Sequence, residues 1–211
     1  LSSLEGNAKN EIIANLQVFY YRLGMMDLKR SNYYTARQNF IAGVAALKEN
    51  IATDNVDQNW VTMRLLNNKI AQCYYEENNF INAVKYYKEA YYSTDIRGRM
   101  DELAMLALSE YLDNQIDSSK VHFQQVEKYY ADGKINYSDG YVKYFYIDWS
   151  LYLYHKSEGN TNKAQKYLTD AYNHIPEDER KQYLEDNDHL EHQHQYYYIH
   201  EIIDTYNQNI R

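Results

Sequence analysis

The chain has 211 residues, with 22 Lys and Arg against 30 Asp and Glu, which gives a formal net charge of −8. This length suits one domain or one repeat array with a sizeable core, and the acidic balance argues against nucleic acid as a partner, because non-specific binding to phosphates needs a basic surface. With only 7 Gly and 1 Pro, the chain is poor in the residues that strand-and-turn folds and Gly-rich nucleotide sites consume, so we expect an all-α fold.

No stretch of the sequence is apolar enough to predict a membrane span. The most apolar run, residues 141–154, contains Lys143 and Asp148, whereas a membrane helix needs about 20 predominantly apolar residues. The single Cys73 excludes an intramolecular disulfide and leaves the compartment open. We favour a cytoplasmic location. Because the first residue is Leu1, removal of a signal peptide with export to a bacterial periplasm, or excision from a longer protein with neighbouring domains, stays open.

Four segments repeat one spacing of small and bulky residues. A first marker is followed by a second twelve residues later, and two more lie four and seven residues beyond the second. In chain order the sets are Gly24, Ala36, Phe40, Gly43; Ala71, Ala83, Tyr87, Ala90; Ala107, Ser119, Phe123, Val126; and Tyr152, Ala164, Leu168, Ala171. Spacings of four and seven share one helix face, and twelve residues let one helix end and another return. The spacing therefore predicts four antiparallel helical hairpins, with small residues at the crossings and rings such as Phe40 filling the space below.

Polar turns are expected inside each hairpin. They fall at residues 29–32, 77–79, 112–114 and 158–161. Each supplies an Asn, Asp, Ser or Thr that is able to cap the following helix.

The tail, residues 179–211, carries no repeat markers. It is polar until Tyr196 and then places Ile199, Ile202, Ile203 and Tyr206 at helical spacing. Because the last unit of an array leaves an apolar face uncovered, we interpret this tail as a C-terminal capping helix or helices. A linker helix into a further domain and a dimerisation surface are the alternatives.

The four segments resemble the tetratricopeptide repeat (TPR) family, whose signature is Trp-x2-Leu-Gly-x2-Tyr followed by Ala, Phe and Pro. The second copy, from Ile70 to Ala90, matches best; in the first copy Tyr20 stands for Trp and Asp27 replaces Tyr, the third copy has Glu110 in that place, and the fourth has the bulky Tyr152 as its first marker. Successive copies start about 47, 36 and 45 residues apart, against a family period of about 34.

The resemblance implies a single array over 1–211, an α-solenoid of antiparallel hairpins wound as a right-handed superhelix. Its approximate repeats would be 17–50, 64–97, 100–133 and 145–178. An unrelated helix bundle or another α-solenoid is the alternative, because amphipathic helices often show Ala and aromatic residues at these spacings.

In the TPR family the first helix of each hairpin lines a concave groove that binds peptides. Carried over copy by copy, the resemblance implies a groove lined by Tyr21, Met25, Asn68, Gln72, Tyr75, Leu108, Tyr111, Tyr146, Trp149, Leu153 and Lys156. Amides such as Asn68 and Gln72 can donate to and accept from a peptide backbone, and the rings offer flat contact area. Packing between repeats is the alternative role for several of the rings.

Catalytic and metal-binding signatures are weak. Glu185, His189 and His192 share one helical face and could hold Zn²⁺, but the order differs from His-Glu-x-x-His, so a solvated polar face is favoured for the cluster that extends to His194 and His200. Cys73 lies near the packing residue Ala71 and is expected to be a buried filler. We therefore expect no enzyme activity, no metal and no cofactor.

Two functions remain. The first is a non-catalytic scaffold that binds a protein or peptide partner through the groove. The second is the sensory or regulatory domain of a larger bacterial signalling or transcription regulator, in which a bound peptide or protein effector changes the curvature of the array.

Overall fold

The computed structural model describes residues 2–52, 61–92, 100–132, 144–185 and 197–210, and every regular element in these ranges is an α-helix. The expected all-α class is therefore confirmed for the described residues. The helices form two compact units, residues 1–96 and 97–211. In the described part of the chain, no helix is both long and apolar enough to cross a membrane.

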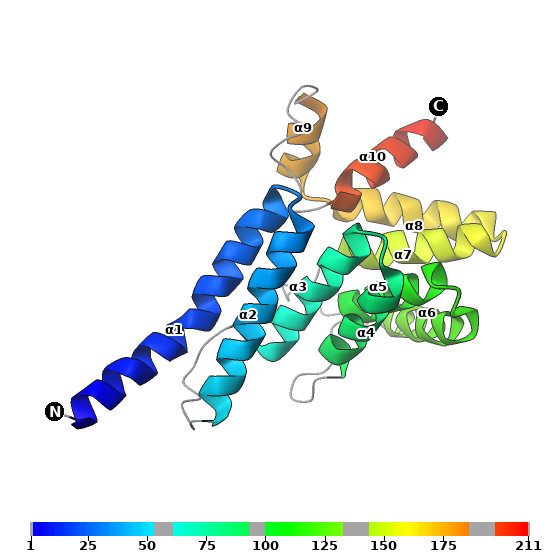
Figure 1. The fold of residues 1–211 in the computed structure, drawn as a ribbon. Helices are drawn as coiled ribbons and strands as arrows, with labels where there is room; N and C mark the ends of the chain where they lie inside the picture. The colour runs from blue at the N-terminus through cyan, green and yellow to red at the C-terminus, as the bar shows by residue number, and fades with distance from the viewer. Residues whose placement is uncertain (1, 53–60, 93–99, 133–143, 186–196, 211) are drawn as a thin grey trace. The chain divides into compact units, whose positions relative to one another are not determined.

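The first unit contains two helical hairpins (Figure 1). Helix α1 (Ser2–Lys29) returns as α2 (Tyr33–Ala52), and α3 (Met63–Glu76) returns as α4 (Phe80–Tyr91). Helix α2 also packs against α3. A buried cluster that includes Leu28, Phe40, Leu66 and Ile70 forms the core of this unit.

The second unit begins with two more hairpins. Helix α5 (Met100–Leu112) pairs with α6 (Ile116–Ala131), α7 (Tyr144–Ser157) pairs with α8 (Thr161–His174), and α5 packs on α7. Two further helices follow, α9 (Glu177–Glu185) and α10 (Tyr197–Ile210). The expected helical hairpins are thus present in sequence order.

All four hairpins use the same turn, at the positions that the sequence indicated. The chain leaves the first helix through one left-handed residue: Ser31 (φ 58°), Asn78 (φ 57°), Asn114 (φ 59°) or Gly159 (φ 72°). The amide of this residue bonds three residues back and the next amide five residues back, as with Ser31 to Leu28 and Asn32 to Asp27. This is the Schellman arrangement, which satisfies the last carbonyls of a helix.

The residue after the left-handed position starts the second helix. The side-chain oxygens of Asn79 and Asn160 accept from the amides of Asn82 and Lys163 at 3.4 and 3.3 Å, which satisfies amides that lack a partner in the first turn. In every hairpin the left-handed residue lies seven positions after the first marker. Tyr152 therefore keeps the common register, although a small residue was expected in its place.

The sixteen marker residues are all buried. Gly24 shows why its position must be small: a Cβ built there would lie 2.5 Å from Cε1 of Phe40, whose ring is fully buried. A Cβ at Gly43 would lie 3.0 Å from Cδ2 of Leu66. The predicted close crossing, with the Phe40 ring in the space beside it, is confirmed in the first hairpin.

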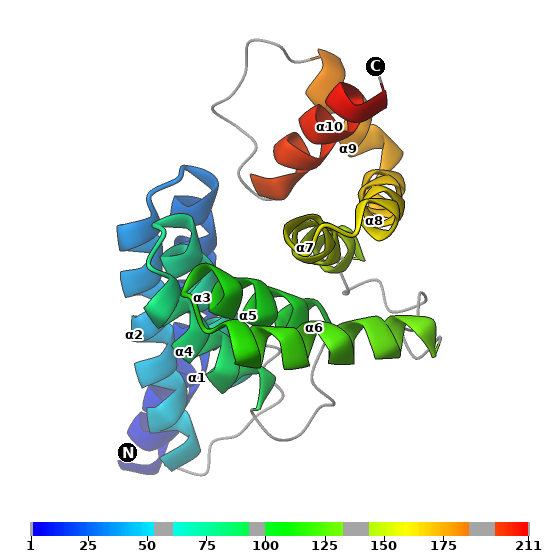
Figure 2. The same ribbon diagram turned by 90° about the vertical axis from the view of Figure 1, so that its right-hand side faces the viewer.

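Helix α10 packs against α7 and α8, as Figure 2 shows at the end of the second unit. Its Ile199, Ile202 and Ile203 are buried, and burying each contributes about 1.5–3 kcal/mol. The ring of Tyr206 stacks on Tyr172 of α8 with centroids 4.0 Å apart. The opposite face of α10 is exposed and polar, at Glu201, Asp204, Asn207, Gln208 and Asn209. The helix therefore covers an apolar face of the last hairpin and presents a polar one.

Candidate functional site

The eleven residues expected to line a groove lie on the first helices of the hairpins, divided between the two units. Tyr21, Met25, Asn68, Gln72 and Tyr75 lie on α1 and α3 in the first unit. Leu108, Tyr111, Tyr146, Trp149, Leu153 and Lys156 lie on α5 and α7 in the second.

Three of these side chains are buried and offer little surface to a ligand. Leu108 is 1 % exposed, Trp149 is 4 % exposed and Tyr75 is 9 % exposed. Lys156 is exposed, and the other seven are half-buried. Leu108, Trp149 and Tyr75 thus contribute mainly to packing.

In the first unit, the residues on α1 also contribute to the core. Tyr21 and Met25 pack against the buried cluster, and the Tyr21 ring lies 5.9 Å from that of Phe40. On α3, the Gln72 side-chain oxygen accepts from Nζ of Lys69 at 3.0 Å. The two half-buried amides, Asn68 and Gln72, lie one helical turn apart and form the polar part of this set.

In the second unit, aromatic rings dominate the set on α7. Trp149 stacks on Tyr152 with centroids 5.0 Å apart, and Nζ of Lys156 lies 5.3 Å from the centre of the Tyr152 ring. The indole nitrogen of Trp149 is buried and makes no hydrogen bond within the described part of the chain. Of the residues expected to line the groove, Tyr146, Leu153 and Lys156 are the ones that stay accessible on α7.

Arg37 connects the two hairpins of the first unit. From α2 it pairs with Glu77 at the end of α3, and its guanidinium lies 4.3 Å from the centre of the Tyr74 ring and 5.4 Å from that of Tyr34. Arg can pair with a carboxylate and stack on rings at once because its charge is spread over a plane.

A second repeating contact joins the helices of every hairpin. One partner lies three residues after the first marker and the other fifteen residues after it. The four pairs are Asp27 with Asn39 (2.8 Å), Tyr74 with Tyr86 (stacked, 5.6 Å), Glu110 with His122 (2.6 Å) and His155 with Tyr167 (stacked, 5.5 Å).

These matched pairs explain two departures from the TPR signature. Asp27 and Glu110 stand where a Tyr is typical, and each faces a polar partner across the hairpin. The sequence reasoning missed the pairs because it treated each departure alone. The signal was present in the sequence, since the same twelve-residue interval that relates the first two markers also relates the partners.

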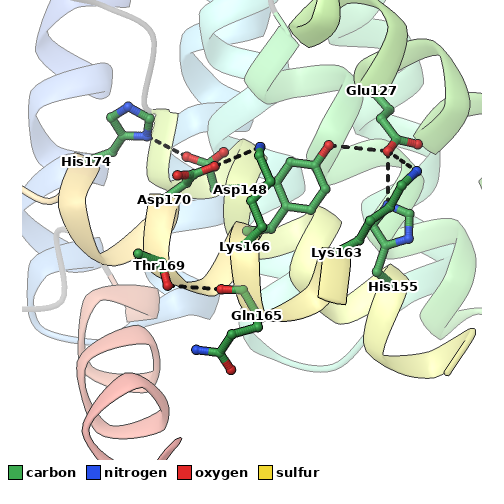
Figure 3. A network of polar contacts seen from close by, with 10 residues as sticks. Glu127, Asp148, His155, Lys163, Gln165, Lys166, Thr169, Asp170 and His174 are labelled. Atoms are coloured by element: carbon green, nitrogen blue, oxygen red, sulfur yellow. Dashed lines mark hydrogen bonds and ion pairs between the residues drawn. The ribbon is translucent and has the colours of Figure 1, made fainter. Parts of the chain in front are cut away.

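A polar network spans α6, α7 and α8 of the second unit (Figure 3). Oε1 of Glu127 accepts from Nζ of Lys163 at 2.6 Å and from the Tyr167 hydroxyl at 3.3 Å, and it lies 3.3 Å from Nε2 of His155. Burial acts to raise the pKa of Glu127, but the Lys163 hydrogen bond and the nearby His155 and Lys163 together lower it. Burial lowers the pKa of His155, against the attraction of Glu127.

The other end of the network is a carboxylate–histidine pair. Nδ1 of His174, the last residue of α8, lies 2.6 Å from Oδ2 of Asp148 on α7, whose side chain is fully buried. The bond to Asp148 raises the pKa of His174 in spite of the burial of the imidazole. Burial raises the pKa of Asp148, and the bond from His174 only partly offsets this effect.

A carboxylate–histidine pair can orient a general base, and in nucleophilic catalysis this base activates a hydroxyl or thiol within hydrogen-bond reach. The hydroxyls of Ser150 and Thr169, on the same two helices, donate to Ile147 and Gln165 carbonyls of their own helices. Cys73, in the other unit, is buried as expected, and burial raises the pKa of its thiol to about 12.

Within the described residues, no group of three or more His, Cys, Asp and Glu side chains is arranged to hold a metal ion. His189, His192 and His194 lie outside the described residues, and Glu185 is the last residue of α9. Comparisons with protein-family models, with curated proteins and with solved structures found no significant match to this chain.

Proposed function

We propose that this chain is a non-catalytic, TPR-like helical-repeat protein that binds a protein or peptide segment through the first helices of its hairpins. The observation that carries the proposal is the fourfold recurrence of one hairpin. In every copy the buried markers, the left-handed turn residue and the two residues of the matched pair occupy the same relative positions. In such arrays each hairpin packs mainly on its neighbours, and the stacked first helices create an extended binding surface.

The accessible first-helix residues favour an extended peptide segment as the ligand. Asn68 and Gln72 provide side-chain amides one helical turn apart on α3, and amides satisfy both the donors and the acceptors of a peptide backbone. Tyr146, Leu153 and Lys156 on α7 combine apolar area with one positive charge. We therefore propose that, each within its own unit, the α3 surface contacts peptide backbone and the α7 surface contacts apolar or acidic side chains.

The test is capture of a partner from a lysate of the source organism, with a photo-reactive residue at position 72 to mark the contact. We expect Asn68→Ala/Gln72→Ala and Tyr146→Ala/Leu153→Ala/Lys156→Ala each to lower binding by about tenfold or more, because contacts near the centre of an interface carry most of its energy. Circular dichroism and thermal melting should match the parent, since none of the five side chains is fully buried.

The matched control is Ile81→Ala/Val121→Ala. It removes apolar side chains that are 65 % and 62 % exposed on the second helices α4 and α6. If this control loses the partner while both first-helix variants keep it, ligands bind the second helices and the proposal is wrong.

A further inference from the structure

The histidines of this chain are distributed unevenly between the two units. All seven lie in residues 97–211, and residues 1–96 contain none. Three of them bridge successive helices of the second unit, each to a carboxylate on the preceding helix. These pairs, called here the histidine ladder, are His122 (α6) with Glu110 (α5), His155 (α7) with Glu127 (α6) and His174 (α8) with Asp148 (α7).

Each His–carboxylate pair of the histidine ladder is called a rung. Helix α7 contributes one residue to each of two rungs. Asp148, near its start, faces α8, and His155, in its last turn, faces α6. One helix thus supplies a carboxylate at one end and an imidazole at the other, as Figure 3 shows. The two rungs hold α7 from different sides.

The rung to α8 needs a protonated imidazole. The Asp148 carboxylate is fully buried, and His174 lies 2.6 Å away at the C-terminus of α8. A cation is favoured at a helix C-terminus, and a buried carboxylate that loses its charged partner is destabilising. Loss of the His174 proton therefore weakens the α7–α8 contact.

The rung to α6 needs a neutral imidazole. The Glu127 carboxylate is already paired with Lys163 at 2.6 Å, and His155 is buried between this pair and the Tyr167 ring, on which it stacks at 5.5 Å. A proton on His155, which is 5 % exposed, would place a buried cation beside the exposed ammonium of Lys163, and charging a buried group is costly. Gain of a proton therefore weakens the α6–α7 contact.

We propose that α7 is a proton-sensitive helix: protonation near neutral pH strengthens its attachment to α8 and weakens its attachment to α6. The mechanism needs no ligand, because protonation of His174 and protonation of His155 have opposite effects on the packing of α7.

The directions of the pKa shifts agree with this geometry. The pKa of His174 is raised above its ordinary 6.5, so its stabilising contribution is present below pH 6.5 and is lost as pH rises through the raised value. The pKa of His155 is lowered below 6.5, so its contribution is present above pH 6.5 and is lost as pH falls through the lowered value.

Other titratable and charged groups surround the two histidines. Around His174 these are Asp148 from α7, Asp170 and Lys166 from its own helix, and Tyr130 of α6, which contacts Asp148. The helix α10, which packs on α8, carries His200, Glu201 and Asp204.

Around His155 the groups are Glu127 of α6, Lys163 and Tyr167 of α8, and Glu158, which follows α7. Helix α5, which packs on α7, carries Asp101, Glu102 and Glu110, and Glu110 forms the remaining rung with His122. Among these residue types, only histidine has an ordinary pKa near neutral pH.

The test is hydrogen exchange of the whole chain, followed by mass spectrometry, with exchange times corrected for the intrinsic effect of pH. Between about pH 6.5 and about pH 8, we expect protection to fall several-fold in the first half of α7 and the last half of α8. Between about pH 6.5 and about pH 5.5, protection should instead fall several-fold in α6 and the last half of α7. Helices α1–α4, which contain no histidine, provide the internal control.

Two variants assign the responses. His174→Gln should remove the response to high pH and leave the response to low pH, and His155→Gln should do the reverse, so each is the control for the other. His174→Lys keeps a permanent cation and should retain protection at high pH. A residue with only a structural role would lower protection equally at every pH.

The parent chain alone tests the direction in which protection changes with pH at each end of α7, so the proposal does not depend on the variants folding. The proposal is overturned if protection changes equally in α1–α4 and in α5–α8. It is also overturned if protection changes with pH in the same direction at both ends of α7. A pH response that both glutamine variants retain would overturn it as well. Because no ligand is present in this experiment, its failure is distinct from failure of the proposed function. If both proposals hold, binding through Tyr146 and Leu153 of α7 depends on pH.

Discussion

At the scale of single residues, the fold depends on a few positions where size or backbone conformation leaves no choice. Gly24 lies against the buried ring of Phe40, at a distance that excludes even a methyl group. Glycine is ordinarily unfavourable inside a helix by about 1 kcal/mol relative to alanine. Its presence inside α1, five residues before the helix ends, therefore indicates that close approach of the two helices is worth more than helix propensity.

We expect Gly24→Ala to lower the free energy of unfolding by about 1–2 kcal/mol, because overpacking outweighs the gain in helix propensity. Urea unfolding followed by circular dichroism measures the change. Gly43→Ala is the matched control, since its new methyl group would lie 3.0 Å from the end of the Leu66 side chain and at an ordinary 3.6 Å from Cβ of Tyr20, and we expect a smaller loss. Phe40→Leu in the Gly24→Ala background should recover part of the loss; equal effects of the two alanine substitutions would contradict this account.

At the scale of the element, the recurring unit is a hairpin with one left-handed residue in its turn. A left-handed conformation costs about 1–2 kcal/mol for most residues and little for glycine. Gly159 occupies this position in the fourth hairpin and asparagine occupies it in the second and third, but the first hairpin uses Ser31. The hydroxyl oxygen of Ser31 is also buried and makes no hydrogen bond within the described residues.

Ser31→Gly should therefore raise the free energy of unfolding by about 1 kcal/mol, because it removes both the backbone strain and the buried hydroxyl. Asn114→Gly serves as the control, and its gain should be smaller, since asparagine tolerates the left-handed region better than serine. Thermal melting compares the two variants with the parent. A destabilised Ser31→Gly variant would mean that the hydroxyl has a stabilising role.

At the scale of the whole molecule, the net negative charge and the histidines are concentrated in one unit. Residues 1–96 carry ten basic and ten acidic side chains, whereas residues 97–211 carry twelve basic and twenty acidic ones, which accounts for the entire net charge of −8. The second unit also contains α10, which buries three isoleucines against the last hairpin. An array needs such a covered end because each hairpin leaves an apolar face for the next one.

We expect Ile202→Ala to lower the free energy of unfolding by about 2–5 kcal/mol, as for other fully buried isoleucines. Hydrogen exchange should show reduced protection in α7, α8 and α10. Asn207→Ala, at an exposed position on the same helix, is the control and should match the parent within about 0.5 kcal/mol. An effect of Ile202→Ala confined to α10 would show that the helix adds little to the hairpin beneath it.

The sequence by itself determined the helices, the four turns and the buried markers. These features are local: a turn needs particular residues within a few positions, and a buried face repeats with the period of the helix. The matched pairs within each hairpin were accessible to the same reasoning, because their interval equals that of the first two markers.

Only the tertiary structure decided which side chains meet between hairpins. No spacing in the sequence indicates that His155 faces Glu127 or that His174 faces Asp148. These pairs join residues 28 and 26 positions apart, and the packing angle of neighbouring helices decides which side chains approach one another. The burial of Trp149 and Leu108, both expected in the groove, arises in the same way, because a helical pattern defines a face but not what covers it.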